Sequence, residues 1–171
     1  MQVSGPNQQL FYLTHMLDPS KSFLQPEPSP AQVGHTFIMV MGSPDISASL
    51  EFWQAYFGND VVGPIPYRIG VLSEAYDLPV ETQHQLALVS MVDGYGIEID
   101  QYPKEATSVP APENERGGVI LVSLQVDPSG LKASLPWALP YKNDKGEEEG
   151  GVVILPSGTP IEVSFTEPLL P

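Results

Sequence analysis

Cysteine is absent from this chain of 171 residues, so disulfide bonds, thiolate metal sites and cysteine nucleophiles are excluded. Basic residues are scarce, because seven Lys and Arg stand against twenty-one Asp and Glu, for a net charge of −14. Such a chain repels nucleic-acid phosphates, and no cluster of basic residues offsets this, so nucleic acid is not an expected partner. An acidic surface suits a cationic ligand or a metal ion, although solubility alone also explains it.

Long hydrophobic runs are absent as well. No apolar stretch approaches the roughly 20 residues that a membrane helix needs. The first residues, 1–6, lack the basic region and the apolar core of a signal peptide. We therefore expect no membrane partner and a cytoplasmic location. Hydrophobic residues nevertheless make up 42% of the chain, which is enough for a packed interior.

Proline marks the first segment, residues 1–34, which we predict to be an N-terminal arm. Residues 10–17 are mostly apolar and can form one strand. Four prolines follow between residues 19 and 30, with polar residues among them. Proline removes a backbone donor and disfavours both helix interiors and central strands, so this part is expected to be an extended linker.

Residues 35–103 have the pattern of a first module. His35 opens a short apolar segment that is typical of a buried strand. Ser43 and Pro44 then suit the N-cap and the first position of a helix. Four apolar residues follow at steps of four, three and four, the spacing of one face of an amphipathic helix: Ile46, Leu50, Trp53 and Phe57. Gly58 stands where the helix should end.

The last strand of this module is predicted at residues 95–102, after a hairpin signal at residues 93–94. Its side chains alternate between the two faces of the sheet. One face should carry Ile97, Ile99 and Gln101. The other face should carry Glu98, Asp100 and Tyr102.

The order then repeats in a shorter form. After a second linker at residues 104–118, the second module occupies residues 119–171, with a strand at 119–126, a short helix at 131–137 and a last strand at 160–165. The final strands of the two modules match as Gly-Ile-Glu-Ile and Pro-Ile-Glu-Val, so that Glu98 and Glu162 are equivalent. A carboxylate that is buried in a strand of β-branched residues must be paired with another group or must bind a ligand such as a metal ion.

His35 at the start of a strand, the helix that ends in Tyr-Phe-Gly and the strand around Glu98 together resemble the vicinal-oxygen-chelate superfamily, which includes glyoxalase, bleomycin resistance protein and extradiol dioxygenase-like proteins. The resemblance covers residues 35–166. It implies an α+β fold in which two βαβββ modules form curved mixed sheets around a cup. It also implies that this cup binds a small organic molecule and, in metal-using members, a divalent ion.

The resemblance implies a metal site made of His35, Glu98 and Glu162, for zinc, nickel, manganese or iron. Glu98 would then also be the catalytic base, and Asp100 and Tyr102, on the same face, would contact the substrate. The position equivalent to His35 in the second module falls at residues 119–120, Val and Ile, which cannot ligate. This departure argues against ring-cleavage chemistry, which needs a second histidine.

Two functions therefore stay open, beside a third option, a non-catalytic structural module whose cup is filled by its own side chains. The first is a metal-dependent lyase or isomerase of the glyoxalase type, acting on a small organic molecule in the cup between the modules. The second is a metal-free protein that binds and sequesters a drug-like cation, which the net charge and the lost ligand position favour. Each candidate residue also has a purely structural interpretation, such as an ion pair for Glu98 or a backbone hydrogen bond for His35. A homodimer is expected, because proteins of this size often bury a sheet edge against a second copy.

Overall fold

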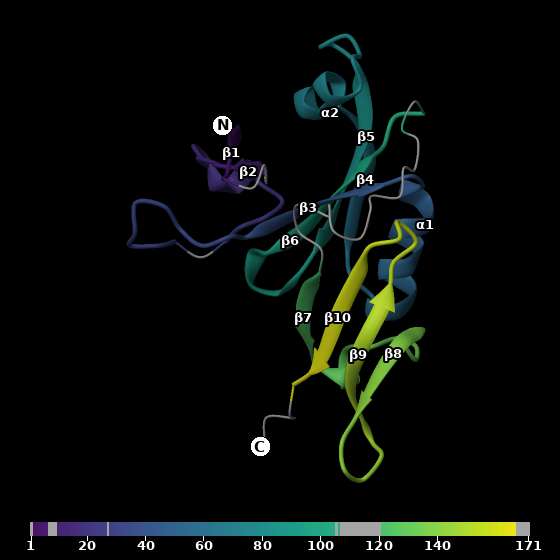
Figure 1. Ribbon diagram of the computed structural model, residues 1–171. Helices are drawn as coiled ribbons and strands as arrows, with labels where there is room; N and C mark the ends of the chain where they lie inside the picture. Colours follow the sequence, from purple (N-terminus) through teal and green to yellow (C-terminus); the bar gives the residue numbers. More distant parts are fainter. Residues whose placement is uncertain (1, 7–9, 27, 105, 107–120, 167–171) are drawn as a thin grey trace.

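The computed structural model describes residues 2–6, 10–26, 28–104, 106 and 121–166. Its strands form one short hairpin and two four-stranded sheets (Figure 1). The predicted linker at 104–118 lies almost entirely outside the described residues, as do the two residues at 119–120. No helix in the described part of the chain is long and apolar enough to cross a membrane.

The first sheet has the order β3-β6-β5-β4, with β3 and β6 parallel and the other pairs antiparallel. Its strands are β3 (Ile38–Ser43), β4 (Val61–Arg68), β5 (Gln83–Ser90) and β6 (Gly96–Gln101). The helical elements of this module are α1 (Ile46–Phe52), the single π-turn η2 (Trp53–Phe57), α2 (Gly70–Ala75) and the 3-10 turn η3 (Val92–Gly94). Helix α2 was not predicted; the buried Ser73 side chain holds it to β5 through a 3.0 Å hydrogen bond with His84 Nε2.

The second sheet repeats this order as β7-β10-β9-β8, again with a parallel first pair. Its strands are β7 (Val122–Val126), β8 (Trp137–Lys142), β9 (Glu148–Ile154) and β10 (Pro160–Phe165). The helix predicted at residues 131–137 is wrong: only the 3-10 turn η4 (Pro128–Gly130) forms, capped by Asp127. The next segment is tied instead to the first module, because the Lys132 backbone N–H donates to the Tyr56 carbonyl at 2.8 Å.

Helix α1 begins two residues later than its sequence signal. Asp45, and not Ser43, is the N-cap, and its carboxylate accepts from the Ala48 backbone N–H at 3.0 Å. The hydroxyl of Ser43 is instead buried and hydrogen-bonded to that of Ser49 at 2.8 Å. The predicted end at Gly58 is confirmed, since this residue takes a left-handed φ of 68°.

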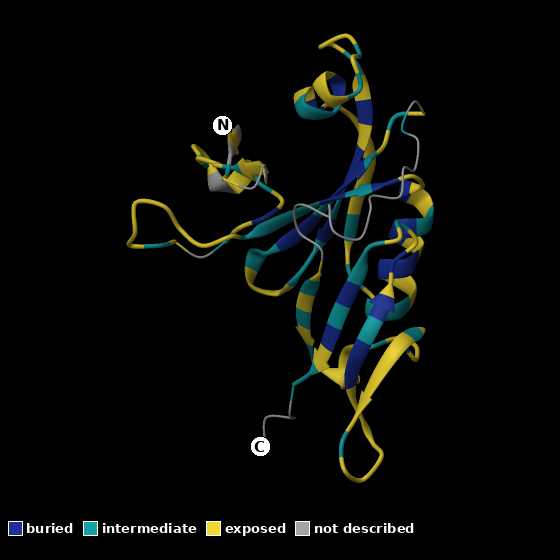
Figure 2. Cartoon of the chain, in the orientation of Figure 1, coloured by how far each residue is buried: buried dark blue, intermediate teal, exposed yellow. Residues whose placement is uncertain are grey.

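A single hydrophobic core unites the two modules. Helix α1 contributes Ile46 and Leu50 of the predicted apolar face, and Trp53, the first residue of η2, is 1% exposed. The first sheet contributes inward side chains such as Ile97 and Ile99, and the second contributes Ile161 and others. Figure 2 shows buried residues along α1 and alternating along β10, whereas β8 is exposed for most of its length. Helix α1 therefore packs on the first sheet, and Trp53 at its end meets Leu155 and Pro156 of the second module. The opposite face of each sheet, which carries Glu98 or Glu162, is called the cup face below.

The arm lies on the first module. It contains the hairpin of β1 (Gln2–Ser4) and β2 (Leu10–Tyr12) and the 3-10 turn η1 (Pro19–Lys21), so the predicted strand at 10–17 is shorter than expected. Leu24, 4% exposed, anchors the arm where Gly96 leaves room for its side chain. A Cβ atom on Gly96 would lie 2.6 Å from a methyl carbon of Leu24.

This close approach predicts that Gly96→Ala loosens the arm. We expect a loss of about 1–3 kcal/mol in the free energy of unfolding, as for other overpacked sites. Tryptic cleavage after Lys21 should become faster, because the anchored segment opens more often. Gly130→Ala is the matched control, since a Cβ there would meet nothing within 4 Å. Equal cleavage rates for the two variants would contradict the anchoring role of this contact.

Candidate functional site

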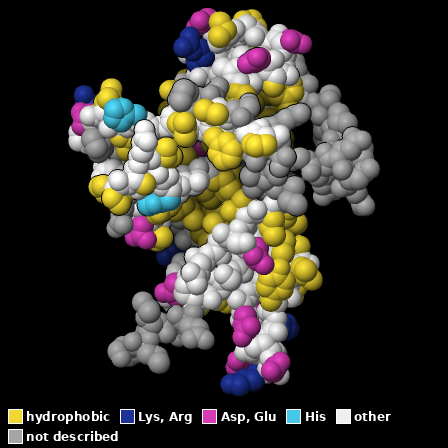
Figure 3. Space-filling view, turned by 60° about the vertical axis from the view of Figure 1, so that its left-hand side comes forward, with side chains coloured by type: hydrophobic (Ala, Val, Ile, Leu, Met, Phe, Trp, Pro, Cys, Tyr) yellow, Lys and Arg dark blue, Asp and Glu magenta, His cyan; other side chains and the backbone are white. Residues whose placement is uncertain are grey.

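A cavity of about 380 Å³ lies between the arm and the cup face of the first sheet. The arm supplies Tyr12, Thr14, Met16, Ser22, Phe23 and Leu24 to its wall. The first module supplies Phe37, Ile38, Val40, Tyr67, Leu88 and Glu98. Figure 3 shows hydrophobic side chains gathered in a hollow in the middle of this side of the molecule, with acidic side chains towards the two ends. The cavity is thus walled mainly by aromatic and aliphatic groups.

Glu98 is the only charged side chain among the described residues that line this cavity. Its place follows from β6: because Ile97 and Ile99 point into the core, Glu98 must point to the cup face. Its cross-strand neighbours are Val40 on β3 and Leu88 on β5, which offer it no counter-charge. The described ion pairs of the chain join other residues.

Asp100 lies two residues further along the same face and is buried, at 4% exposure. Burial, the neighbouring Glu98 charge and a hydrogen bond to Glu98 raise the pKa of Asp100 to about 7. Burial also raises the pKa of Glu98, while the hydrogen bond from Asp100 opposes this. One of the Asp100 oxygens, Oδ1, is buried without a hydrogen-bond partner. Below about pH 7 Asp100 therefore keeps a proton that it can donate to the Glu98 carboxylate.

Tyr102 was predicted to face a substrate beside Glu98. Its ring lies against Gly42, where a Cβ atom would clash with it, and its backbone N–H donates to the Ser43 carbonyl at 2.8 Å. Burial and the nearby Tyr76 and Asp100 raise the pKa of Tyr102. Neither Tyr102 nor Asp100 is among the described residues that line the cavity. Their predicted contact with a substrate remains a prediction.

His35 and Glu162 lie apart from this cavity. Strand β3 begins only at residue 38, so His35 falls in the preceding segment, where it is exposed and stacks on Tyr95 with ring centroids 5.7 Å apart. Glu162 lies on the second sheet, where its carboxylate accepts hydrogen bonds from Ser123 Oγ and, at 3.2 Å, from Tyr141 Oη.

The positions of these side chains within one chain do not fit a divalent metal ion. A protein metal site directs three or more ligands at one point. Among the described residues, no group of three or more His, Asp and Glu side chains has this arrangement. Glu98 is turned to Asp100 and Glu162 to two hydroxyls, so the resemblance-based set of His35, Glu98 and Glu162 is not brought together.

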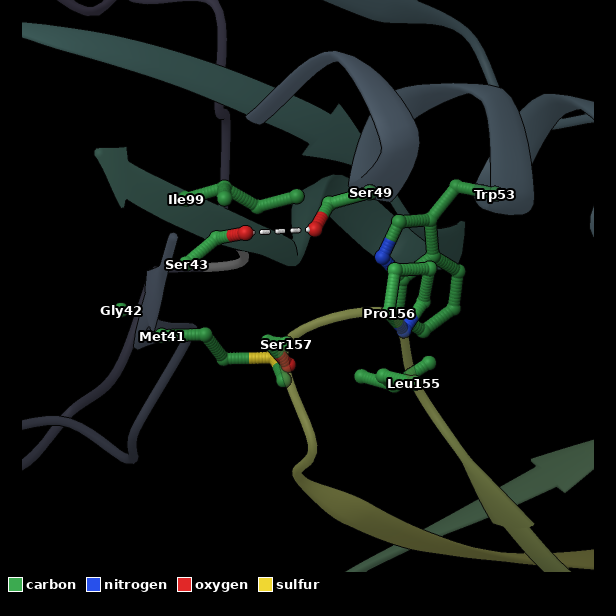
Figure 4. A pocket seen from close by; sticks show the side chains of 9 residues that line it. All are labelled: Met41, Gly42, Ser43, Ser49, Trp53, Ile99, Leu155, Pro156 and Ser157. Carbon is green, nitrogen blue, oxygen red and sulfur yellow. Dashed lines mark hydrogen bonds between the residues drawn. The ribbon is translucent and has the colours of Figure 1, made fainter. Parts of the chain in front are cut away.

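A second depression lies where the two modules meet. Figure 4 shows the depression where the end of β3 and helix α1 meet the β9–β10 turn. Trp53, Leu155 and Pro156 close it, and the Ser43–Ser49 hydrogen bond crosses one side. It has no room for a water-sized molecule. The 380 Å³ cavity thus lies under the arm, and a binding cup between the modules, which the resemblance implies, stays a prediction.

Sequence reasoning missed the cavity residues of the arm and missed Tyr67. The arm reads as a proline-rich linker, and nothing in its pattern shows which surface it covers. Tyr67 did carry a signal, because Ile65-Pro66-Tyr67-Arg68 at the end of β4 recurs as Leu139-Pro140-Tyr141-Lys142 at the end of β8. This second internal match places a tyrosine on the edge strand of each sheet.

No protein-family model matches the sequence, and no curated protein matches it. Among solved structures, a glyoxylase/bleomycin resistance protein/dioxygenase domain from Frankia sp. EAN1pec is similar over 82% of this chain and 96% of that one, at 10% identity and a TM-score of 0.51. A glyoxalase/dioxygenase from Nostoc punctiforme covers 82% and 97%, at 16% identity and a TM-score of 0.48. Lactoylglutathione lyase from Agrobacterium tumefaciens covers 80% and 96%, at 16% identity and a TM-score of 0.46.

The chain has the vicinal-oxygen-chelate fold. The α+β class and the two modules with curved mixed sheets predicted from the sequence are confirmed. Since a vicinal-oxygen-chelate fold at such low identity hosts many activities, the function has to be argued from the side chains of this chain.

The raised pKa of Asp100 predicts how stability depends on pH. Between its ordinary value of 3.8 and about 7, the folded protein keeps the Asp100 proton while the unfolded chain has lost it. The free energy of unfolding should therefore fall as pH rises through this interval, by on the order of 1.4 kcal/mol per pKa unit, and level off above it.

Urea unfolding of the parent and of Asp100→Asn at about pH 5 and about pH 8 checks this linkage. The variant should lose less stability between the two pH values, because asparagine does not titrate. Asp127→Asn is the control, since the pKa of this exposed carboxyl is lowered by hydrogen bonds from Ser129. Parallel pH curves for the parent and Asp100→Asn would rule out a buried, protonated Asp100.

Proposed function

We propose that this protein binds a small organic cation with an aromatic or aliphatic body in the cavity between the arm and the first sheet, with Glu98 as the group that receives the positive charge. The observation that carries the proposal is a cavity walled by apolar and aromatic side chains in which one carboxylate is the only charged group described.

The dimensions of the cavity fit this role. Small-molecule sites commonly enclose about 300–1,000 Å³ and combine an apolar lining with a few placed polar groups. With a volume of about 380 Å³, this cavity would hold a ligand that consists of one ring or of two fused rings. Tyr12, Phe23 and Tyr67 offer ring faces or edges, and Thr14 and Ser22 offer hydroxyls, so that the lining suits a ligand that is mostly apolar.

The charge of the ligand follows from the surroundings of Glu98. A desolvated carboxylate is costly unless an opposite charge or hydrogen bonds accompany it. Asp100 supplies one hydrogen bond, and the flanking Val40 and Leu88 supply none. An ammonium, amidinium or guanidinium group of a ligand would provide the missing counter-charge, and nearby aromatic rings would add cation–π attraction.

Isothermal titration calorimetry tests this selectivity with three probes that share a naphthalene ring and differ in charge. They are a naphthylmethylammonium ion, neutral naphthylmethanol and the naphthoate anion. We expect the ammonium ion to bind most tightly and naphthoate least. In Glu98→Gln, affinity for the ammonium ion should fall at least about tenfold, the size of a lost charge-assisted hydrogen bond, while affinity for naphthylmethanol changes little.

Glu162→Gln is the matched control, because it removes the equivalent carboxylate of the second sheet, which does not line the cavity. Its affinity for the ammonium probe should equal that of the parent. The proposal fails if the three probes bind equally, or if Glu98→Gln leaves their order of affinity unchanged.

The raised pKa of Glu98 favours a second candidate, a lyase or isomerase reaction in which Glu98 is the general base. Enzymes raise glutamate pKa values by burial so that the carboxylate can take a proton near neutral pH. A bound molecule with an acidic C–H would then exchange that hydrogen with deuterium from D₂O. Loss of this exchange in Glu98→Gln, with ligand binding retained, would distinguish catalysis from binding alone.

A metal-independent site makes a separate prediction. After equilibrium dialysis against zinc, nickel, manganese or iron(II), the parent should hold no stoichiometric ion. His35→Ala should therefore contain no less metal than the parent. A chelator should likewise leave affinity for the ammonium probe unchanged, because Glu98 is engaged by Asp100 and His35 lies elsewhere. One bound ion per chain, lost in both His35→Ala and Glu162→Ala, would restore the metal site implied by the resemblance.

A further inference from the structure

One buried side chain anchors the arm beside the cavity. Leu24 is 4% exposed, and it is the one buried residue among the arm residues whose side chains are described. Its socket lies where β5 turns into β6, because Gly96 leaves space for it and a Cβ atom on Gly94 would overlap the backbone of Gln25. The arm residues that line the cavity run from residue 12 to residue 24, so the anchor holds their carboxyl-terminal end.

The other end of this lining alternates between the cavity and solvent. Tyr12, Thr14 and Met16 line the cavity. Of the side chains next to them, Phe11 is 50% exposed and Leu17 is 87% exposed. Such alternation is that of a strand with one covered face. Residues 10–17, which begin with β2, are called the flap below.

The turn between the flap and the anchor is held by hydrogen bonds within the arm. The Asp18 carboxylate accepts from the Ser20 hydroxyl at 2.6 Å and pairs with Lys21 at 3.3 Å. The Ser22 hydroxyl donates to the Leu24 carbonyl at 2.5 Å. These bonds do not depend on where the flap lies, so the flap can move relative to the anchor without breaking them.

The cavity weakens the hold of the empty protein on the flap. Side chains that border a void lose the dispersion contacts that packed neighbours would supply. The opposite wall is fixed, because Val40, Glu98 and Leu88 lie side by side on three paired strands. A ligand that fills the 380 Å³ would contact both walls at once, and would therefore stabilise the closed flap more than an open one.

We propose that the flap opens about the turn at residues 18–21 to admit a ligand and closes over it, while Leu24 stays in its socket. The identity of the ligand rests on the proposed function, whereas the motion rests on the structure of the arm. Closure places Tyr12 and Met16 against the side of the ligand that faces away from Glu98. Opening of the flap would then limit how fast the ligand leaves, as lids do in many enzymes.

Double electron–electron resonance measures this motion directly. The chain has no cysteine, so spin labels can be attached at introduced cysteines without removing native ones. Leu17→Cys on the flap and Val80→Cys between α2 and β5 are suitable positions, at 87% and 64% exposure. Without ligand, we expect a broad distance distribution that contains open and closed flaps. Saturating naphthylmethylammonium ion should narrow it to one component.

Two controls separate flap motion from other changes. Labels at Val80→Cys and Val92→Cys lie beyond the two ends of β5, and their distance should be the same with and without the probe. Leu24→Ala in the Leu17/Val80 pair should raise the ratio of open to closed flaps at least about tenfold, because the anchor loses its buried contacts. Val33→Ala, at a position that is 66% exposed, is the matched control and should leave this ratio unchanged.

Hydrogen exchange gives a second readout that needs no substitution. Amides of residues 10–17 should exchange faster than those of β5 in the empty protein, since a flap that opens locally exposes them. Adding the naphthylmethylammonium ion should slow exchange in the flap. Equal exchange in the flap with and without the bound probe would overturn the closure.

The outcomes distinguish this inference from the proposed function. One narrow distance between residues 17 and 80 that a calorimetrically bound probe leaves unchanged would overturn the flap while the binding proposal stands. A broad distance in the empty protein, with no calorimetric binding of the probe, would support the opening and overturn the proposed ligand. Equal distributions in Leu24→Ala and Val33→Ala would overturn the role of the anchor.

Discussion

The alternation of side chains along β6 is the constraint on which the site depends. Ile97 and Ile99 are each 2% exposed and pack in the core, so the register of this strand cannot shift by one residue without exposing them. Glu98 and Asp100 are consequently held on the opposite face, whatever that placement costs in desolvation. The arm then covers part of this face, anchored by Leu24 against Gly96. A carboxylate without a described counter-charge, in a mostly apolar cavity, is the direct result of core packing on the other side of the same strand.

The two equivalent glutamates show how neighbours change the role of one motif. Glu98 lies between Val40 and Leu88, and its one described side-chain partner is a second carboxyl group, that of Asp100. At the equivalent position on β10, Glu162 lies between Ser123 and Val152 and accepts two hydroxyl hydrogen bonds. Glu162 thus accepts from two neutral hydroxyls, whereas Glu98 is flanked by apolar side chains and hydrogen-bonds to a neighbouring acid. The two halves of the repeat therefore place one motif in two different surroundings.

The sequence predicted those features that periodicity controls. Steps of three and four residues identified the face of α1, and strict alternation identified which side chains of β6 share a face. Features that depend on tertiary partners were not predictable in the same way. Asp45 displaced Ser43 as the N-cap because Ser43 found a buried partner in Ser49. The helix expected near residues 131–137 gave way to packing against the first module.

The site was less predictable than the fold for the same reason. The sequence pattern identified Glu98 through its strand, but the walls of its cavity come from an arm whose path no local pattern encodes. The resemblance implied His35 as a metal ligand, yet β3 begins three residues beyond it and leaves it stacked on Tyr95. A resemblance transfers strand order reliably, whereas a ligand set also requires side chains from separate elements to converge within ångströms.

Residues of α1 and Trp53 share one core with the inner face of the second sheet, whose module has the turn η4 as its described helical element. Both cup faces turn away from this core. The first cup face is partly covered by the arm, and the second has exposed apolar side chains along β8. Tyr67 belongs to the cavity wall and also to β4, the edge strand of the first sheet, so the cavity reaches the edge of that sheet.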